Sequence, residues 1–318
     1  MSKRVCVVLG GTGLLGKSLT GQLVEAGWTV RSISRSGPPS GVVKRWWSDV
    51  EWITAALGSD ACARALRGTE IVFHLASTTV PSASDVAYDI ESNVLASVRT
   101  LEAAVSANVR RVVFASSGGT VYGVAQETPI PESHPTNPIC CYGIQKLALE
   151  KYLQVFQLSK RLDSICLRIS NHYGEDQDLS KPLGAVAHFA ARAARGLPIE
   201  IWGDGSVTRD YVHVEDVAEA FIRAVNYRGS ETIMNIGTGR GVSLNQLVQF
   251  IQEGLAAHVA VDYKPARSFD VAENVLDIQR VRHELGWEPK VSLELGIRRM
   301  ILKAREDQRS RPVESLVL

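Results

Sequence analysis

A cluster of three glycines near the amino terminus most constrains how this chain can fold. Gly10, Gly13 and Gly16 follow an apolar run over residues 5–9 and open a segment of helical spacing over residues 14–26. One glycine allows a tight turn, one lets the backbone approach a pyrophosphate, and one lets the helix pack closely on the strand. Because both flanking elements are present, we interpret the cluster as a nucleotide-binding turn rather than an ordinary flexible loop.

Short apolar runs alternate with longer segments of helical spacing through the first half of the chain. The predicted strands are residues 4–9, 29–34, 70–75, 110–115 and 164–169, and the predicted helices are residues 14–26, 92–107 and 141–159. Near-continuous Val, Ile and Leu content is typical of parallel strands that helices cover on both faces. We therefore predict an α/β fold built on a Rossmann-type, doubly wound parallel sheet.

The pattern of elements changes in the second half of the chain, where prolines and glycines separate shorter elements. We predict helices over residues 214–225, 244–254 and 293–305. The sequence thus predicts two domains with interleaved connections: a nucleotide-binding domain over residues 1–170 and a smaller α/β substrate-binding domain over residues 171–318. The charged tail from about residue 307 is expected to fray.

The charge balance excludes several kinds of partner. Across 318 residues, 35 Lys and Arg balance 34 Asp and Glu, so the chain lacks the basic surface that nucleic acid needs. No run approaches the ~20 apolar residues of a membrane span, and residues 5–9 are too short for a signal-peptide core. The five cysteines have no CxxC spacing. We expect a cytoplasmic chain with reduced thiols that binds no metal, membrane or nucleic acid.

The end of the second predicted strand bears on the choice of nucleotide. A nucleotide-binding turn is normally followed there by an acidic residue that accepts hydrogen bonds from the adenosine ribose. Here the strand ends in Ser34 and Arg35. Arg35 can pair with a 2′-phosphate, which favours NADP; alternatively it is a solvated surface residue or stacks on adenine. Asp49 is a candidate for contact with the adenine edge.

Tyr142 and Lys146 are four residues apart in a predicted helix, which places them on one face. Tyrosine has an ordinary pKa of about 10, and a neighbouring ammonium group favours the phenolate and lowers that pKa. A tyrosine tuned in this way can take a proton from a sugar hydroxyl while a nicotinamide takes the hydride. The alternative is a packed Tyr142 beside a solvated Lys146.

Three hydroxyls follow the fourth predicted strand, on Ser116, Ser117 and Thr120. In an open α/β sheet, ligands bind at the carboxyl ends of the strands. We therefore expect these hydroxyls to point into the same crevice as the glycine turn. Taken alone, the stretch would be an ordinary serine-rich turn.

Further motifs occur in a fixed order along the chain. The first half holds GGTGLLG at 10–16, HLAS at 74–77, Asn93, SSGGTVYG at 116–123 and YGIQK at 142–146. The second half holds RISNHYG at 168–174, WGDGSVTRDYVHVED at 202–216 and LGWEP at 285–289. Over nearly its whole length the chain resembles the extended short-chain dehydrogenase/reductase family, in its nucleotide-sugar epimerase and dehydratase branch.

The resemblance implies a first domain that binds NAD or NADP and a second that binds a nucleoside diphosphate sugar. Tyr142 would be the base, and Lys146 would hold the cofactor ribose. The implied cofactor contacts are Gly10, Gly13, Leu14, Leu15, Gly16, Ser34, Arg35, Asp49, Leu75, Ala76, Ser77, Asn93, Ser116, Tyr142 and Lys146. The implied substrate contacts are Asn171, Arg209 and Arg267 to phosphates, Asp270 to the ribose, and Asn274, whose small side chain would tolerate an N-acetyl group.

One position departs from the family pattern. Gly118 stands where the epimerases usually carry a catalytic Ser or Thr, so the hydroxyl partner of the base must be Ser117, which we favour, or Thr120. The resemblance implies 4-epimerisation of a UDP-hexose or UDP-N-acetylhexosamine, with an NADPH-dependent reductase of a 4-keto nucleotide sugar as the alternative. A 4,6-dehydratase is disfavoured, because Gly119 and Thr120 replace its usual acidic pair.

Two further expectations concern the chain as a whole. A catalytically silent nucleotide-binding regulator is disfavoured, because both Tyr142 and Lys146 are retained. Family members usually pair through two helices, and the apolar-faced helices predicted over residues 92–107 and 141–159 provide such a four-helix contact. We therefore expect a homodimer.

Overall fold

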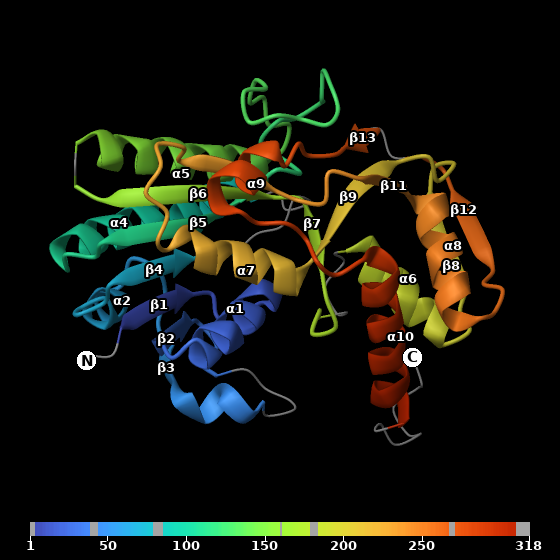
Figure 1. Ribbon diagram of the computed structural model, residues 1–318, viewed down its shortest axis with the longest axis horizontal. Coiled ribbons are helices and arrows are strands. Elements are labelled where there is room, and N and C mark those ends of the chain that lie inside the picture. The colour runs from blue at the N-terminus through green and yellow to red at the C-terminus, as the bar shows by residue number, and fades with distance from the viewer. Residues whose placement is uncertain are drawn as a thin grey trace.

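The computed structural model describes residues 4–38, 44–78, 85–159, 161–178, 184–266 and 271–309. A wholly parallel, seven-stranded sheet forms the larger part of the molecule (Figure 1). In spatial order its strands are β10 (Ile233–Ile236), β6 (Asp163–Ile169), β5 (Arg111–Ser117), β4 (Ile71–His74), β1 (Val5–Leu9), β2 (Thr29–Ser34) and β3 (Val50–Thr54). The strand order runs outwards from β1 in both directions, which confirms the predicted doubly wound sheet.

Strand β1 explains why helices cover both faces of this sheet. Its side chains alternate, so Cys6 and Val8 face one side while Val7 and Leu9 face the other, and all four are fully buried. Helices α1 (Leu14–Glu25) and α7 (Val214–Ala224) pack together on the first face (Figure 1). Helices α4 (Ala96–Ser106) and α5 (Cys141–Leu158) pack on the second. Each buried aliphatic side chain contributes about 1.5–3 kcal/mol.

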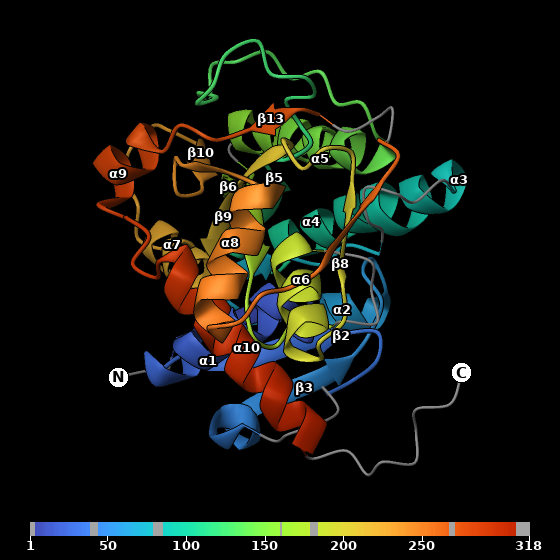
Figure 2. The ribbon, with the colours of Figure 1, turned by 90° about the vertical axis from the view of Figure 1, so that its right-hand side faces the viewer.

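The second half builds its own small core beside this sheet. Strands β11 (Gly241–Ser243), β9 (Thr208–His213) and β13 (Glu273–Asn274) pair in that order, and β7 (Asn171–Tyr173) also pairs with β9. Strands β8 (Ile199–Trp202) and β12 (Val261–Lys264) form a separate pair. Helices α6 (Ala185–Ala194), α8 (Leu244–Leu255) and α10 (Leu293–Arg309) lie together (Figure 2) and bury a shared apolar cluster.

The chain returns to the large sheet after entering the second half. Helix α7 packs against α1, and strand β10 extends the sheet beside β6. Helix α9 (Gln279–Leu285) then contacts β10 and α7. Trp287, which is fully buried in the same apolar cluster as β1, donates its indole N–H to the Asp216 carbonyl at 2.9 Å. The large sheet is therefore completed by residues that follow the proposed boundary at 170.

Several elements were not predicted. In the second half they are the strands β7 to β13 and the helices α6 and α9. In the first half they are the edge strand β3, a 3₁₀ turn over Arg45–Asp49, helix α2 (Asp60–Ala65), helix α3 (Val86–Asp89) and a π-helical turn over Ile90–Leu95. The helix predicted over 92–107 therefore begins earlier, where the Asp85 side chain caps α3 by accepting from the Tyr88 N–H. Within the described ranges, no helix is both long and apolar enough to cross a membrane.

Candidate functional site

The glycine turn lies at the carboxyl end of β1 and is closely packed. Gly10 has a φ of +88°, and a Cβ there would lie 2.9 Å from the backbone of Ala76. A Cβ on Gly16 would lie only 2.2 Å from the Gly10 carbonyl oxygen. Both positions therefore require glycine, as the sequence predicted.

The first turn of α1 presents backbone donors to the crevice. Gly13 precedes the helix without a side-chain cap, and a Cβ on it would meet only the Gly10 oxygen, at 3.4 Å. The first N–H groups of a helix have no partner within the helix. Leu14 and Leu15 pack their side chains against the core, which leaves their backbone for a ligand. This arrangement fits a dinucleotide pyrophosphate.

The segment after β4 borders the same turn. The Leu75 N–H donates to the Leu9 carbonyl at 3.0 Å, and Ala76 packs on Gly10. Asn93 is buried, and its side-chain oxygen accepts from the Thr78 N–H at 2.8 Å. Asn93 therefore holds this segment in place, and the residues predicted to meet the cofactor, 75–77, lie at the carboxyl edge of the sheet.

The residues predicted to meet the adenosine divide into two groups. Ser34 and Arg35 lie at the end of β2, at the same carboxyl edge of the sheet as the glycine turn. The Ser34 hydroxyl donates to the Gly37 carbonyl at 2.7 Å. The exposed Arg35 donates to the Tyr88 hydroxyl at 3.1 Å. Asp49 precedes β3, whose first residue pairs with Val30 at the start of β2. It therefore lies at the amino edge of the sheet, and the prediction that it meets adenine is wrong.

Lys146 is buried on α5, where its ammonium group has a backbone carbonyl as hydrogen-bond acceptor. Its Nζ donates to the Ala115 carbonyl at 2.7 Å and lies 5.5 Å from the centroid of the Tyr142 ring. Burial lowers the pKa of Lys146 to about 8, against the opposing field of Glu150 one turn further along the helix. Tyr142 and Lys146 thus share one helix face, as predicted.

The pKa of Tyr142 shifts in the direction opposite to our expectation. Burial raises it to about 12, with a smaller contribution from Cys140. The Lys146 ammonium faces the aromatic ring. In these surroundings, desolvation of the phenolate dominates, and Lys146 is not among the causes of the shift.

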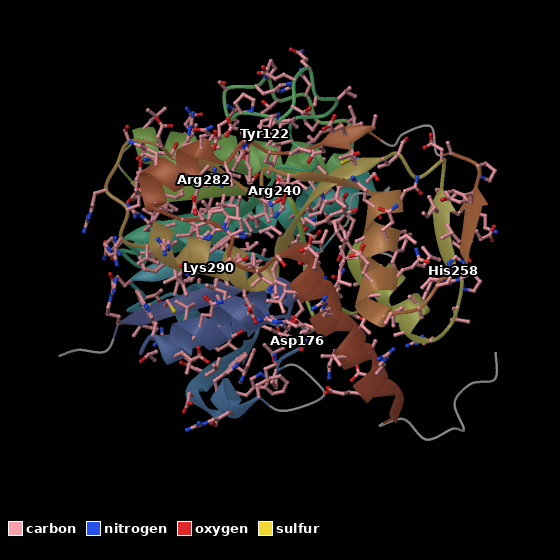
Figure 3. All side chains as sticks on the ribbon, turned by 45° about the vertical axis from the view of Figure 1, so that its right-hand side comes forward. Tyr122, Asp176, Arg240, His258, Arg282 and Lys290 are labelled. Atoms are coloured by element: carbon pink, nitrogen blue, oxygen red, sulfur yellow. The ribbon has the colours of Figure 1, made fainter. Side chains whose placement is uncertain are left out.

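The three hydroxyls do not share one direction. Ser116 is buried and donates to Glu150, which forms a buried ion pair with Arg168 at 2.6 Å. Because side chains alternate along β5, Ser117 points to the other side. The prediction that Ser116 points into the crevice is therefore wrong. Tyr122, labelled in Figure 3, lies with its ring 4.9 Å from the Arg168 guanidinium and completes this buried group.

Thr120 lies against the start of α5. A Cβ on Gly143 would lie 2.7 Å from the Thr120 carbonyl oxygen, so the loop and the helix are in close contact beside Tyr142. The Thr120 hydroxyl is buried, and no hydrogen-bond partner for it occurs among the described residues. A buried hydroxyl without a partner is unfavourable by about 1–3 kcal/mol unless a ligand satisfies it.

A pocket of about 270 Å³ in the second half brings together two predicted substrate residues. Asn171 and Arg209 both line it, and their side chains donate to the backbone carbonyls of Asp210 and Thr208. Phe189, Trp202 and Tyr211 add aromatic surface. Arg267 and Asp270 lie outside the described residues.

Asn274 occupies a different setting from the one expected. It is buried on β13, and its side-chain N–H donates to the Gly118 carbonyl at 3.2 Å. Its Oδ1 is buried without a hydrogen-bond partner within the described part of the chain. Asn274 therefore anchors the second half to the loop that carries Ser117 and Thr120.

Most of the lining residues, His172 and Trp202 among them, were not singled out by the sequence analysis. His172 and Trp202 line the same pocket as Asn171 and Arg209. His172 is partly exposed, and burial together with the Lys146 charge lowers its pKa to about 4. The motifs RISNHYG and WGDGSVTRDYVHVED contain both residues, but only the tertiary fold shows that they meet.

A glycine turn on a parallel sheet, with a Tyr–Lys pair at the same carboxyl edge, defines a dinucleotide-dependent Rossmann-fold enzyme. Residues 6–237 match the model of the NAD dependent epimerase/dehydratase family. The chain belongs to this family, for which NAD is the cofactor.

Relatives match the chain over nearly its full length. UDP-glucose 4-epimerase of Mycolicibacterium smegmatis is 36% identical over 303 residues, which cover 93% of this chain and 96% of the relative. dTDP-4-dehydro-6-deoxyglucose reductase of Escherichia coli is 31% identical over 311 residues, covering 95% and 98%. The crystal structure of UDP-glucose 4-epimerase from Thermotoga maritima with UDP-glucose is 34% identical, with a TM-score of 0.89, covering 96% and 99%. The chain is therefore an enzyme of the nucleotide-sugar epimerase type.

Proposed function

We propose that this protein interconverts the 4-epimers of a UDP-hexose or UDP-N-acetylhexosamine. One observation carries the proposal: Asn171 and Arg209 line one pocket, and His172, which follows Asn171 on β7 and faces the other side of that strand, lies within the field of the Lys146 charge. A sugar attached to a diphosphate in this pocket would therefore extend towards the Tyr142–Lys146 pair. The Thermotoga maritima epimerase, solved with UDP-glucose, supports the choice of nucleotide.

The reaction follows from the residues at the carboxyl edge. Tyr142 removes the proton of the sugar 4-hydroxyl and later returns it. NAD held at this edge would supply the acceptor and donor of the C4 hydride, and the positive charge of its oxidised nicotinamide would favour the phenolate of Tyr142. Lys146, with a pKa of about 8, is mainly charged at neutral pH and holds its ammonium at the Ala115 carbonyl.

We assign the hydroxyl partner of Tyr142 to Thr120 in preference to Ser117. The Thr120 hydroxyl is buried beside the start of α5 and lacks a partner among the described residues, whereas a sugar oxygen would satisfy it. Asn171 and Arg209 bind the diphosphate, because an arginine can pair bidentately with phosphate oxygens.

A reductase of a 4-keto nucleotide sugar is the second candidate. Arg35 and Tyr88 are hydrogen-bonded at the carboxyl end of β2, where a 2′-phosphate would meet them. The relative in Escherichia coli is named as such a reductase. Net consumption of NADPH with a 4-keto substrate would favour this function, whereas tightly retained NAD would favour the epimerase.

Product analysis tests the epimerase directly. Purified protein is incubated with UDP-glucose or UDP-GlcNAc, and the 4-epimers are separated by chromatography. Tyr142→Phe should abolish turnover and preserve substrate binding, while Tyr152→Phe, an exposed tyrosine on the same helix, should retain activity. Absence of a 4-epimer from every common UDP-sugar would refute the proposal.

We also propose a homodimer through α5. Its outer face exposes an apolar row, Ile144, Val155 and Leu158, each more than half exposed in the single chain. Solvent exposure of such a row is unusual unless a partner covers it. The exposed Ile90 on the adjacent π-helical turn extends the same surface, since that turn packs on α5.

A further inference from the structure

Strand β9 carries Arg209, and Asp210 is the next residue along it. The strand runs between the large sheet and the helices of the second half (Figure 1). Arg209 and Tyr211 line the pocket, so the side chain of Asp210, between them, points to the opposite face of the strand. The backbone carbonyl of Asp210 accepts from the Asn171 side chain at 3.3 Å. Asp210 therefore adjoins both residues proposed to bind the diphosphate, on the far side of the strand from the pocket.

The side chain of Asp210 is fully buried, and its carboxylate bonds two other segments of the chain. Thr238 donates its N–H at 2.8 Å and its hydroxyl at 2.6 Å to one carboxylate oxygen. Gly239 and Leu276 donate their N–H groups to the other oxygen, at 3.1 Å and 3.4 Å. Burial of a carboxylate is unfavourable unless hydrogen bonds satisfy it. These four donors therefore account for a charged side chain at this position.

The two bonded segments belong to different parts of the fold. Thr238 and Gly239 follow strand β10, which lies at the edge of the large sheet beside β6. A Cβ on Gly237 would lie 2.3 Å from a carboxylate oxygen of Asp210, so the chain that leaves β10 passes directly against this group. Leu276 follows β13, which pairs with β9. Asp210 thus joins β9 both to the end of a large-sheet strand and to the segment after β13.

The segment at Leu276 also contacts the catalytic loop. A Cβ on Gly118 would lie 2.5 Å from the Leu276 side chain, and Asn274 donates to the Gly118 carbonyl at 3.2 Å. Leu276 and Asn274 are both buried. Gly118 lies two residues before Thr120, in the loop that carries the catalytic hydroxyl. A buried set of contacts therefore runs from the diphosphate-binding strand through Asp210 to this loop.

We propose that Asp210 is a positioning residue, which holds the diphosphate-binding strand β9 in place relative to the catalytic loop. The inference rests on the proposed function, because it assumes that one substrate spans the distance from Arg209 to Tyr142. Every residue that lines the pocket lies between 171 and 244, whereas Tyr142 lies on α5 of the first half. Loss of the Asp210 carboxylate should therefore impair alignment of the bound sugar more than binding of UDP. A misplacement of about 1 Å can lower a reaction rate about 100-fold.

Turnover and UDP affinity, measured on the same variants, separate these two effects. Asp210→Asn keeps the shape of the side chain but turns an N–H₂ group towards N–H donors, on Thr238 or on Gly239 and Leu276. We expect kcat for epimerisation of UDP-glucose to fall about tenfold or more. The dissociation constant of UDP, measured by titration calorimetry, should change less than about twofold.

Smaller substitutions provide the controls. Thr238→Val removes the hydroxyl that donates to Asp210 and should lower kcat about threefold without a change in UDP affinity. Thr238→Ser, which keeps the hydroxyl, should restore turnover. Asp262→Asn, at an exposed position on β12 of the same half, should change neither quantity.

Each outcome has a separate meaning. Unchanged kcat for Asp210→Asn, or equal losses of kcat and UDP affinity, would overturn the positioning role and leave the proposed function intact. If Asp210→Asn does not fold, as judged by circular dichroism, the Thr238→Val protein replaces it, and an unchanged kcat there would overturn the role. Absence of both turnover and UDP binding in the wild-type protein would refute the proposed function and the inference with it.

Discussion

The buried ion pair between Glu150 and Arg168 provides a sharp test of how the site is supported. Both side chains are almost inaccessible, at 1% and 3% exposure, and Arg168 donates to both carboxylate oxygens, at 3.0 Å and 2.6 Å. Ser116 donates to the same carboxylate. We predict that Glu150→Gln, which preserves shape and removes the charge, strongly destabilises the protein.

The magnitude follows from the lost charge. Glutamine keeps one acceptor but turns an amide N–H₂ towards the Arg168 guanidinium, which remains buried and unpaired. Removing one member of a buried ion pair costs about 3–5 kcal/mol. With a urea m value of about 3 kcal/mol/M, the unfolding midpoint should fall by about 1–1.7 M.

Urea unfolding followed by circular dichroism measures this effect. Asp307→Asn removes the partner of Lys303 in an exposed pair and serves as the control, with a loss of about 0.5 kcal/mol or less. Replacing Glu150 and Arg168 together by methionine should recover most of the stability, because no buried charge remains unpaired. A loss below about 1 kcal/mol for Glu150→Gln would refute the argument from desolvation.

Three further predictions concern the pair on α5, the glycine turn and the dimer. Lys146 has a folded pKa of about 8, below its unfolded value of about 10.5, so the unfolded chain binds more protons between these pH values and stability rises with pH there. Between pH 8 and 10.5, the free energy of unfolding of the wild-type protein, measured with urea, should therefore rise by up to about 3 kcal/mol relative to that of the Lys146→Met protein. The absence of such a rise would contradict a buried ammonium group at Lys146. Gly16→Ala places a Cβ 2.2 Å from the Gly10 oxygen and should release NAD, measured by absorbance after gel filtration; full retention would contradict the geometry. The Val155→Arg protein should be a monomer by light scattering. The Leu302→Arg protein, changed at an exposed residue of α10, should remain a dimer. A dimer for both variants would argue against an interface through α5.

Local patterns predicted the strands β1, β2, β4, β5 and β6 of the large sheet but not its two edge strands, β3 and β10. The bounds of β2, Thr29–Ser34, were predicted residue for residue, because Thr29, Val30 and Ile33 give this run a composition that favours a strand. Strand β3 was missed, since an edge strand leaves Glu51 and Thr54 exposed and lacks a continuous apolar run. That omission also misplaced Asp49, which lies directly before β3, at the amino edge of the sheet.

The candidate site was predictable where it depends on spacing alone. The glycines and the Tyr142–Lys146 pair depend on neighbours within one turn, so the sequence reveals them. Ser116 was assigned to the crevice because the alternation of side chains along β5 was not applied. The surroundings of His172 could not be predicted in this way, because they depend on Lys146 and on strand β9, which are distant in the chain.

Strand β10 has a consequence for how the protein is made. It pairs with β6, but the intervening chain first builds β7, α6, β8, β9 and α7. During synthesis, the outer edge of β6 therefore stays unpaired until Ile233–Ile236 has left the ribosome, and an unpaired strand edge can recruit other chains. Expression of residues 1–170 alone should therefore give an aggregation-prone fragment. Once β10 has been translated, it can pair with β6 and cover the exposed edge of the cofactor-binding sheet.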